Sequence, residues 1–487
     1  MIKSIIRNSI WIIFLGTFAR VYAQNNLPHY LIKKEIDSIS PNQNISKDSL
    51  FSTKDENKEK AAPLNIPDEN IQNLLQDLHQ KAPKLTKFII KTIEALNRGY
   101  YNVDSFIDIG NLFYSLGKND IEGTRIRIGA RTYFSPNDMW RVQGYGAYGF
   151  RDNQFKYGLE AKYMLNKTNR WTIGAATRRD IVQLGVHPKD NVIMRRAFTS
   201  SSFLTRGDNP NLSNVHQVHI FSSIEPIKNL EIRIDGSVQS ISSANPSRFN
   251  TDYYLNNQIR KNLNDSHISV SIIAKPLATY SETGVERKEQ TTNTPTIALK
   301  YTKGIQGLFN ADFGYNKLQL MYTQLIPAGT WGKSILHFEA GKNFEPLPLA
   351  LQNIIPGNQT FSPIQATFSQ LNYYEFVADK YATMHLEHYF NGKIFSHIPL
   401  IKILKWKEIA IFRAAIGSLS DASKNMNVER IYSAPNQYPY YEYGLGIENI
   451  GLGNFRIFRV DFNWRGNYLY KPNAPKFGIK AGIQMNF

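Results

Sequence analysis

The last stretch of the chain, residues 455–487, alternates apolar and polar residues with a period of two. Apolar residues occupy every second position from Phe458 to Trp464, and after a turn near 471–476 the alternation resumes from Phe477 to Phe487. Successive side chains on a β-strand point to opposite faces, so each segment has one apolar and one polar face. A soluble β-sandwich would bury the apolar face. A ten-residue alternation that ends on an aromatic residue favours a transmembrane β-barrel strand, apolar toward lipid and polar toward the lumen.

The N-terminus predicts export. Lys3 and Arg7 precede a short apolar run, and small residues follow near Ala23. This order is typical of a secretory signal peptide, residues 1–23, and the apolar run is too short to span a bilayer as a helix. An exported chain without a helical span can still cross a membrane as a closed barrel, because its strands satisfy one another's backbone hydrogen bonds.

The amino-acid composition limits the kinds of site and partner that the chain can have. The chain has no cysteine, which excludes disulfides, thiolate metal sites and a cysteine nucleophile. Its net charge of +17 would suggest nucleic acid in a soluble protein. The arginines occupy alternating strand positions, however, and the chain carries an export signal. We therefore expect a polar lumen, and surfaces that face outer-membrane lipid and lipopolysaccharide, and no nucleic-acid partner.

The segment before the strands divides into two parts. Residues 24–65 are polar and poorly periodic, so we expect a flexible periplasmic leader. Residues 66–98 carry two amphipathic stripes, separated by Pro83, and predict a short helical periplasmic segment. Helices with such stripes cannot bury themselves, so this segment plugs the barrel, docks on its rim or recruits a periplasmic partner.

Residues 99–487 predict an all-β fold, a transmembrane antiparallel β-barrel of about sixteen strands. An even number of strands is typical of single-chain bacterial barrels. The expected strands lie near 106–114, 123–134, 139–150, 154–164, 170–182, 214–225, 229–242, 265–276, 295–303, 311–325, 330–343, 379–391, 407–419, 438–449, 454–468 and 476–487.

Connection lengths and aromatic residues support this strand order. If the first strand rises from the periplasm, the longest connections lie outside and most inner turns are tight; the exceptions are the inner turns 277–294 and 392–406. Tryptophans at the start of rising strands predict an inner aromatic girdle, and tyrosines an outer one. The inner girdle comprises Trp140, Trp171, Trp331 and Trp406, and the outer one Tyr373, Tyr374, the 438–443 run, Tyr468 and Tyr470.

The polar faces predict a structural network of charges in the lumen. Its expected members are Arg125, Arg127, Arg131, Glu387, Glu442, Glu448, Arg459, Asp461 and Arg465. The C-terminal Ile483, Met485 and Phe487 are expected to form the membrane-assembly signal that the barrel-assembly machinery reads. A lipid-facing Phe462→Arg should block assembly, whereas Asn463→Arg on the lumen face should be far milder.

No motif predicts a catalytic, cofactor or metal site. The glycines at 144, 146 and 149 match the dinucleotide fingerprint, but that motif needs a following helix, and here a turn and another strand follow. They are better explained as barrel glycines beside aromatic residues. His385 and Glu387 share a strand face, but His388 points to the other face. We therefore expect a protein without enzymatic activity.

Several stretches resemble a known family. They include Ile121-Glu-Gly-Thr-Arg-Ile-Arg-Ile-Gly-Ala-Arg131, Tyr374-Glu-Phe-Val-Ala-Asp-Lys-Tyr-Ala382 and His385-Leu-Glu-His-Tyr-Phe-Asn-Gly392. Over roughly 99–487 the chain resembles an outer-membrane barrel family of unknown function that commonly follows a carboxypeptidase-regulatory-like domain. Residues 24–98 are too short and too helical to hold that domain.

That family is distantly similar to the surface-antigen superfamily of outer-membrane assembly and secretion barrels. The resemblance implies sixteen strands and a long outer loop between the eleventh and twelfth, where this chain has 344–378. The superfamily's Arg-Gly-aromatic tip is not found there. We expect a structural, assembly or export role; the alternatives are a passive channel for small anionic solutes and an outer-membrane hydrolase.

Overall fold

The computed structural model describes residues 100–483 except 105, 111–114, 185–208, 288, 292, 453–454 and 472. The predicted signal peptide, leader and helices therefore lie outside the described residues, and so do Met485 and Phe487. Ile483 is described only through its backbone, which pairs with Phe458.

The described residues form one antiparallel sheet of eighteen strands and two small two-stranded sheets. β2 and β3 both pair with β4 and together occupy one strand position, so the sixteen predicted positions all occur, and β1 is an addition. The strands are β1 Tyr100–Asp104, β2 Ile107–Gly110, β3 Leu116–Asn119, β4 Gly123–Thr132, β5 Trp140–Gly149, β6 Gln154–Asn166, β7 Trp171–Val182, β8 Ser213–Ile227, β9 Leu230–Ser243, β12 Asn262–Ala274, β13 Thr296–Gly304, β14 Tyr315–Pro327, β15 Lys333–Asn343, β18 Lys380–Tyr389, β19 Lys407–Ser418, β20 Tyr440–Leu452, β21 Phe455–Arg465 and β22 Phe477–Ile483.

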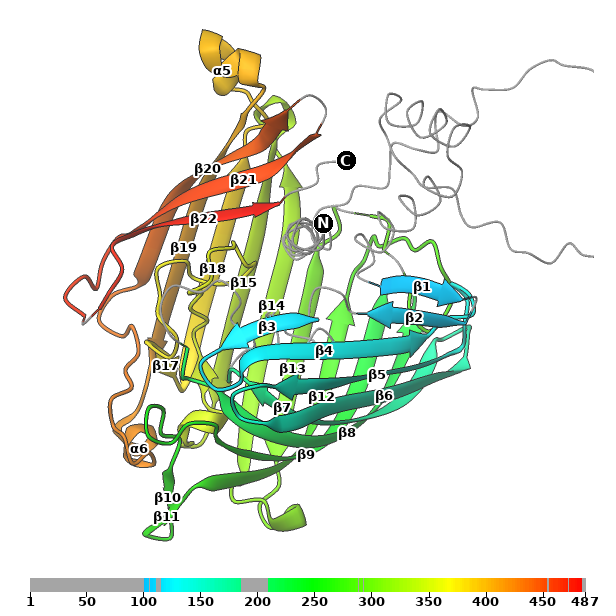
Figure 1. Ribbon diagram of the computed structural model, residues 1–487, viewed down its shortest axis with the longest axis vertical. Helices are drawn as coiled ribbons and strands as arrows, with labels where there is room; N and C mark the ends of the chain where they lie inside the picture. Colours follow the sequence, from blue (N-terminus) through cyan, green and yellow to red (C-terminus); the bar gives the residue numbers. More distant parts are fainter. Residues whose placement is uncertain are drawn as a thin grey trace, which may run out of the picture.

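The sheet curls around an interior, and β1–β3 and β22 form its two edges (Figure 1). Within the described ranges no strand pairing joins these edges. The edge of β22 has another partner, because the Ala481 N–H donates to the Phe361 carbonyl at 2.7 Å. The fold is all-β and barrel-like, as predicted.

The two faces of the sheet reverse the burial pattern of a soluble protein. On β4 the outward Ile128 side chain is 71 % exposed, whereas the inward Arg125 side chain is 2 % exposed. The same alternation runs along β20, where Leu445 points outward and Glu442 is buried. Apolar residues outside and charged residues inside are the arrangement that the period-two pattern predicts.

The glycine-rich stretch at 144–149 lies within β5 and is followed by a turn and β6, not by a helix. A Cβ on Gly146 would lie 2.9 Å from the Phe155 ring across the β5–β6 pair. The glycines of this stretch therefore leave room for side chains of the next strand, as expected for barrel glycines.

The connections differ between the two ends. One end, here called the outer end, carries the long connections with β10 (Tyr253–Leu255), β11 (Gln258–Arg260), η2 (Leu308–Asn310), η4 (Leu349–Leu351), β16 (Asn353–Ile354), β17 (Val377–Ala378) and α6 (Asp421–Asn425) (Figure 1). The inner end carries η3 (Gly329–Trp331), η5 (Phe395–His397) and α5 (Pro399–Leu404). In the part of the chain with described coordinates, no helix combines the length and apolarity needed to cross a membrane.

The outer connections fold over the sheet and pack into a common hydrophobic core. It joins strand ends to four outer connections, and its buried members are Leu184, Val215, Ile241, Phe249, Tyr253, Leu263, Tyr315, Leu347, Leu349, Leu351, Ile354, Tyr374, Val377 and Tyr432. The predicted outer girdle is therefore wrong in part, because Tyr374, Tyr440 and Tyr468 are buried inside while Tyr438, Tyr443 and Tyr470 are exposed.

Candidate functional site: the filled lumen

The first charged cluster lies on the inner faces of β4, β5 and β7. The Arg125 guanidinium contacts the carboxylates of Glu122 at 2.9 Å and Asp180 at 2.7 Å. The Tyr145 hydroxyl donates to Asp180 at 2.6 Å, and the Arg127 guanidinium lies 3.6 Å from the Tyr145 ring centroid. A buried arginine needs such partners, because taking an unpaired charge out of water costs several kcal/mol.

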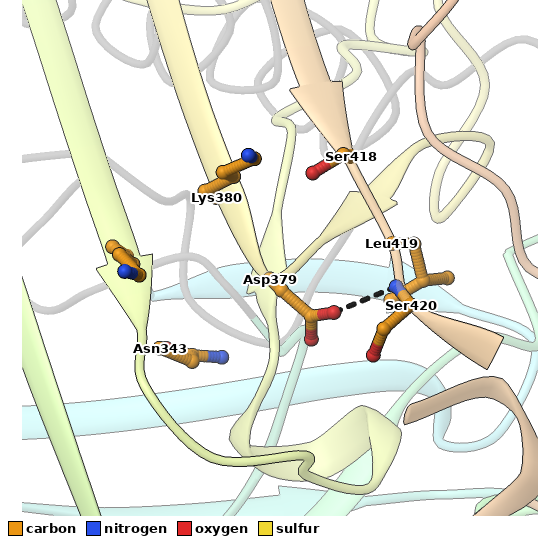
Figure 2. Close-up of a pocket in the computed structure, with 7 residues that line it drawn as sticks. Asn343, Asp379, Lys380, Ser418, Leu419 and Ser420 are labelled. Atoms are coloured by element: carbon orange, nitrogen blue, oxygen red, sulfur yellow. Dashed lines mark hydrogen bonds between the residues drawn. The ribbon is translucent and has the colours of Figure 1, made fainter. Parts of the chain in front are cut away.

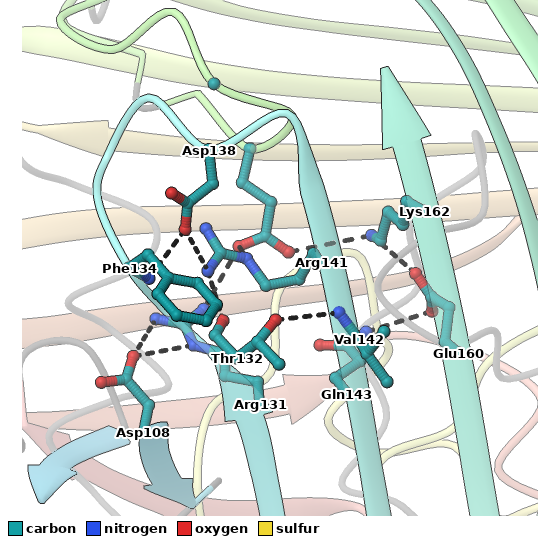
Figure 3. A network of polar contacts seen from close by, with 12 residues as sticks. Asp108, Arg131, Thr132, Phe134, Asp138, Arg141, Val142, Gln143, Glu160 and Lys162 are labelled. Atoms are coloured by element: carbon teal, nitrogen blue, oxygen red, sulfur yellow. Dashed lines mark hydrogen bonds and ion pairs between the residues drawn. The ribbon is translucent and has the colours of Figure 1, made fainter. Parts of the chain in front are cut away.

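A second cluster lies nearer the inner end (Figure 3). Arg131 contacts Asp108 at 2.9 Å and Glu286 at 3.2 Å. Glu286 also lies 3.7 Å from the Arg141 guanidinium and 3.8 Å from the Lys162 ammonium. One carboxylate from the β12–β13 connection thus faces basic side chains from three other strands.

The connection that carries Glu286, residues 277–294, reaches across to inner turns that are far away in the sequence. The Thr283 hydroxyl donates to the Asn137 side chain at 2.9 Å. The Arg170 guanidinium donates to the Gly284 carbonyl at 2.9 Å. The long inner turn that looked like an exception in the sequence is therefore a packed element, which bridges the inner ends of β4–β7 and β12–β13.

The third cluster lies on β18, β19 and β21. The Arg459 guanidinium contacts Asp461 at 2.6 Å and Glu387 at 3.0 Å, and it donates to the Tyr389 hydroxyl at 2.8 Å. The Arg413 guanidinium lies 3.7 Å from Glu387. Because Arg459 and Asp461 are both fully buried, this cluster is a packed part of the wall and not a water-lined surface.

Loop 344–378 runs inside the curl of the sheet, where it is tied to the last three strands (Figure 1). The Glu442 carboxylate on β20 accepts hydrogen bonds from the backbone N–H groups of Ser369 and Gln370, both at 2.8 Å. It also accepts from the Tyr440 hydroxyl at 2.7 Å. A fully buried carboxylate thus binds backbone donors that would otherwise lose their hydrogen bonds to water.

Two further side chains of the wall hold the same loop. The Arg465 guanidinium on β21 forms a bidentate contact with the Glu375 carboxylate, at 2.6 and 3.2 Å. On β22, the Lys480 ammonium donates to the carbonyls of Asn358, at 2.7 Å, and Thr360. Loop 344–378 is therefore fixed along its length by a carboxylate, a guanidinium and an ammonium group from β20, β21 and β22.

An apolar cluster completes the contact between the loop and the wall. The rings of Phe376 and Tyr440 meet edge to face, with centroids 5.4 Å apart. Burial of such rings stabilises the contact through the apolar area removed from water. The buried members of this loop–wall cluster are Ile355, Phe368, Leu371, Phe376, Ala415, Tyr440 and Tyr468.

The loop also contacts two other outer connections, those that follow β7 and β9. The Tyr374 hydroxyl, outside the strands, accepts a hydrogen bond from the Leu184 backbone at 2.8 Å, and its ring packs on Phe249. Burial raises the pKa of Tyr374 above its usual range, so the hydroxyl stays neutral. Among the described residues no group of three His, Cys, Asp or Glu side chains could hold a metal ion.

The structure places the nine expected lumen residues on inward-facing strand positions. Glu448 is buried on β20, in register with Lys407. Sequence reasoning missed Arg413, Lys480 and Glu286. The first two occupy the inward phase of their strands, so the period-two pattern could have found them. No local pattern marks Glu286, because its partners are more than a hundred residues away.

Comparison with known proteins gives one family and several distant folds. The C-terminal domain of a family of unknown function (DUF5686) matches residues 92–447. No curated protein matches the chain.

Three solved structures that resemble the chain share about a tenth of its sequence. BamA from Haemophilus ducreyi lacking POTRA domains 1–3 is 10 % identical, with a TM-score of 0.44, over 77 % of this chain and 69 % of that one. CdiB from Acinetobacter baumannii is 10 % identical, with a TM-score of 0.38, over 77 % of this chain and 58 % of that one. OccK10 (OpdN) from Pseudomonas aeruginosa is 9 % identical, with a TM-score of 0.29, over 78 % and 98 %.

Proposed function

We propose a role for this chain, which belongs to the family of unknown function DUF5686, as an outer-membrane β-barrel whose lumen is held closed by loop 344–378. Its role is structural, or in assembly or export, and not catalytic. The apolar outward face supports the membrane location, because side chains such as Ile128 and Leu445 would be exposed to water in a soluble protein.

The observation that carries the proposal is the way the loop is fixed. Glu442, Arg465 and Lys480 bind it from three strands, and an apolar cluster packs behind them. A loop held by buried charge-assisted hydrogen bonds does not exchange freely with an open position, because each broken contact would leave a buried charge without its partner.

A passive channel for anions is less well supported. Anion selectivity would need unpaired positive charges along the lumen. Two of the three arginines on β4 have carboxylate partners, Asp180 and Glu122 for Arg125 and Asp108 and Glu286 for Arg131. Paired charges create little net potential along a pore. The alternation of arginines on β4 is thus better explained by wall structure than by ion selection.

Single-channel recording in a planar lipid bilayer tests the closed lumen. The purified full-length protein should give no steady large conductance. Glu442→Ala combined with Arg465→Ala should release the loop and produce frequent large openings. Glu429→Ala, an exposed residue of an outer connection, is the matched control and should stay closed. A steady, ion-selective conductance from the unaltered protein would favour the channel instead.

The assembly or export role needs a partner. Mild cross-linking in native outer membranes, followed by purification of the full chain, should retain one defined periplasmic or outer-membrane protein. Recovery of the barrel alone at every cross-linker concentration would leave a structural role as the better description.

A further inference from the structure

Two lysines stand side by side on the outward face at the outer end of the sheet. Lys342, near the end of β15, is directly opposite Lys380, the first residue of β18. Both side chains are exposed. Like charges directly opposite each other on neighbouring antiparallel strands repel, and an anion bound between the two ammonium groups would relieve this repulsion.

A hollow of about 280 Å³ opens between these strand ends (Figure 2). Besides the two lysines it is lined by hydroxyl, amide and carboxylate groups and by one apolar side chain. These residues are Asn343, Asp379, Ser418, Leu419 and Ser420. The hollow therefore combines two cationic groups with hydroxyl donors, which are the groups that bind phosphate oxygens.

The carboxylate in the hollow does not neutralise the lysines. Asp379 accepts hydrogen bonds from the Ser420 backbone at 2.7 Å, the Ser423 hydroxyl at 2.6 Å and the Gln352 amide at 2.9 Å. In the described part of the chain, no carboxylate lies within 4.0 Å of either ammonium group. Asp379 is thus engaged by neutral donors of the loops, and it offsets neither lysine charge.

Below the lysines, the outward face is apolar and begins with short side chains. The next pair toward the inner end is Ala340 and Ala382, followed by Phe338 opposite Met384 and Leu336 opposite Leu386. Phe344, whose ring centroid lies 4.5 Å from the Lys342 ammonium, is 52 % exposed beside them. A cationic pair above an apolar track fits a molecule with an anionic head and a hydrocarbon chain.

We propose that Lys342 and Lys380 bind the phosphate of a lipid headgroup in the outer leaflet. The acyl chain of this lipid lies along the Ala340–Ala382 step and the apolar residues below it. The inference rests on the proposed outer-membrane barrel, and it adds a specific lipid site to an otherwise uniform apolar surface. A free phosphate ion would use the two lysines but not the apolar track.

Native mass spectrometry of the full-length protein in detergent tests the site. The probes are a phosphorylated lipid A-type glycolipid, the same lipid without phosphate, and inorganic phosphate. Lys342→Gln with Lys380→Gln should weaken binding of the phosphorylated lipid about 30-fold, because each basic residue near an anionic surface contributes roughly a factor of five. Lys342→Arg with Lys380→Arg should retain the lipid.

The matched control is Lys303→Gln, another exposed residue at the outer end, which stands opposite Asn316 instead of a second lysine. It should bind the lipid as the unaltered protein does. Equal lipid binding by the double glutamine variant would overturn the site, and inorganic phosphate that binds as tightly as the lipid would overturn the lipid assignment. Heat-modifiable gel mobility and conductance report on the barrel separately, so a folded, closed barrel that retains no lipid contradicts only this inference.

Discussion

At the scale of single residues, inward-facing positions are more constrained than a polar lumen would suggest. Asn463 is fully buried, and its side-chain oxygen accepts a hydrogen bond from Arg413 at 2.8 Å. An arginine at this position would face Arg413 instead of water. We therefore expect Asn463→Arg to be damaging and not mild, because the lumen at this height is packed.

Arg459 is the residue whose loss should be most damaging in the third cluster. Arg459→Met leaves the buried carboxylates of Asp461 and Glu387 without their guanidinium, and breaking a buried pair in this way costs about 3–5 kcal/mol. We expect the variant to lose heat-modifiable gel mobility at a lower temperature. Adding Asp461→Asn and Glu387→Gln should recover part of the loss. No recovery in the triple variant would contradict the account of a buried charge cluster.

At the scale of elements, glycines opposite aromatic rings shape the strand pairs. Gly304 on β13 is in register with Tyr315 on β14, and a Cβ there would lie 2.2 Å from the tyrosine ring. Tyr315 is buried, and its hydroxyl donates to Asp265 at 3.1 Å. Gly304 thus leaves room for the Tyr315 ring, whose hydroxyl group links β14 to Asp265 on β12.

Gly304→Ala should therefore destabilise the barrel by about 1–3 kcal/mol, the usual cost of overpacking a filled site. Gly236→Ala is the matched control, because its added Cβ would meet only Ile220, at 3.4 Å. Urea unfolding followed by tryptophan fluorescence compares the two. If both variants unfold at the same urea concentration, Tyr315 can shift to accommodate the added methyl group without lowering the stability of the barrel.

The strands could be predicted from the sequence because each one carries its own alternation. All sixteen positions follow from local patterns, and the inward residues follow from their phase. The fixing of loop 344–378 could not be predicted, because its contacts join Ser369 to Glu442 and Asn358 to Lys480 over long separations in the sequence. The contacts of Glu286 and Tyr374 are equally distant in the sequence. The role of Glu286 could therefore not be predicted, and the sequence pattern wrongly assigns Tyr374 to the outer girdle.

At the scale of the whole molecule, the outward face should tolerate substitutions that change the size of an apolar side chain but not substitutions that introduce a charge. Ile128→Arg places a charge in the middle of β4 on this face, where it costs about 2–4 kcal/mol in a membrane. We expect the variant to be missing from the outer-membrane fraction, whereas Ile128→Phe should be present at normal levels. Normal membrane levels of the arginine variant would place this face away from lipid.

The position of loop 344–378 in the chain also imposes an order in time. The loop is synthesised before β20, β21 and β22, yet Glu442, Arg465 and Lys480, the three charged groups that hold it, all belong to those last strands. A chain that ends before Tyr440 has the loop but none of these partners. The loop is therefore fixed late in folding, and it closes the lumen only after the last strands have been synthesised and have joined the sheet.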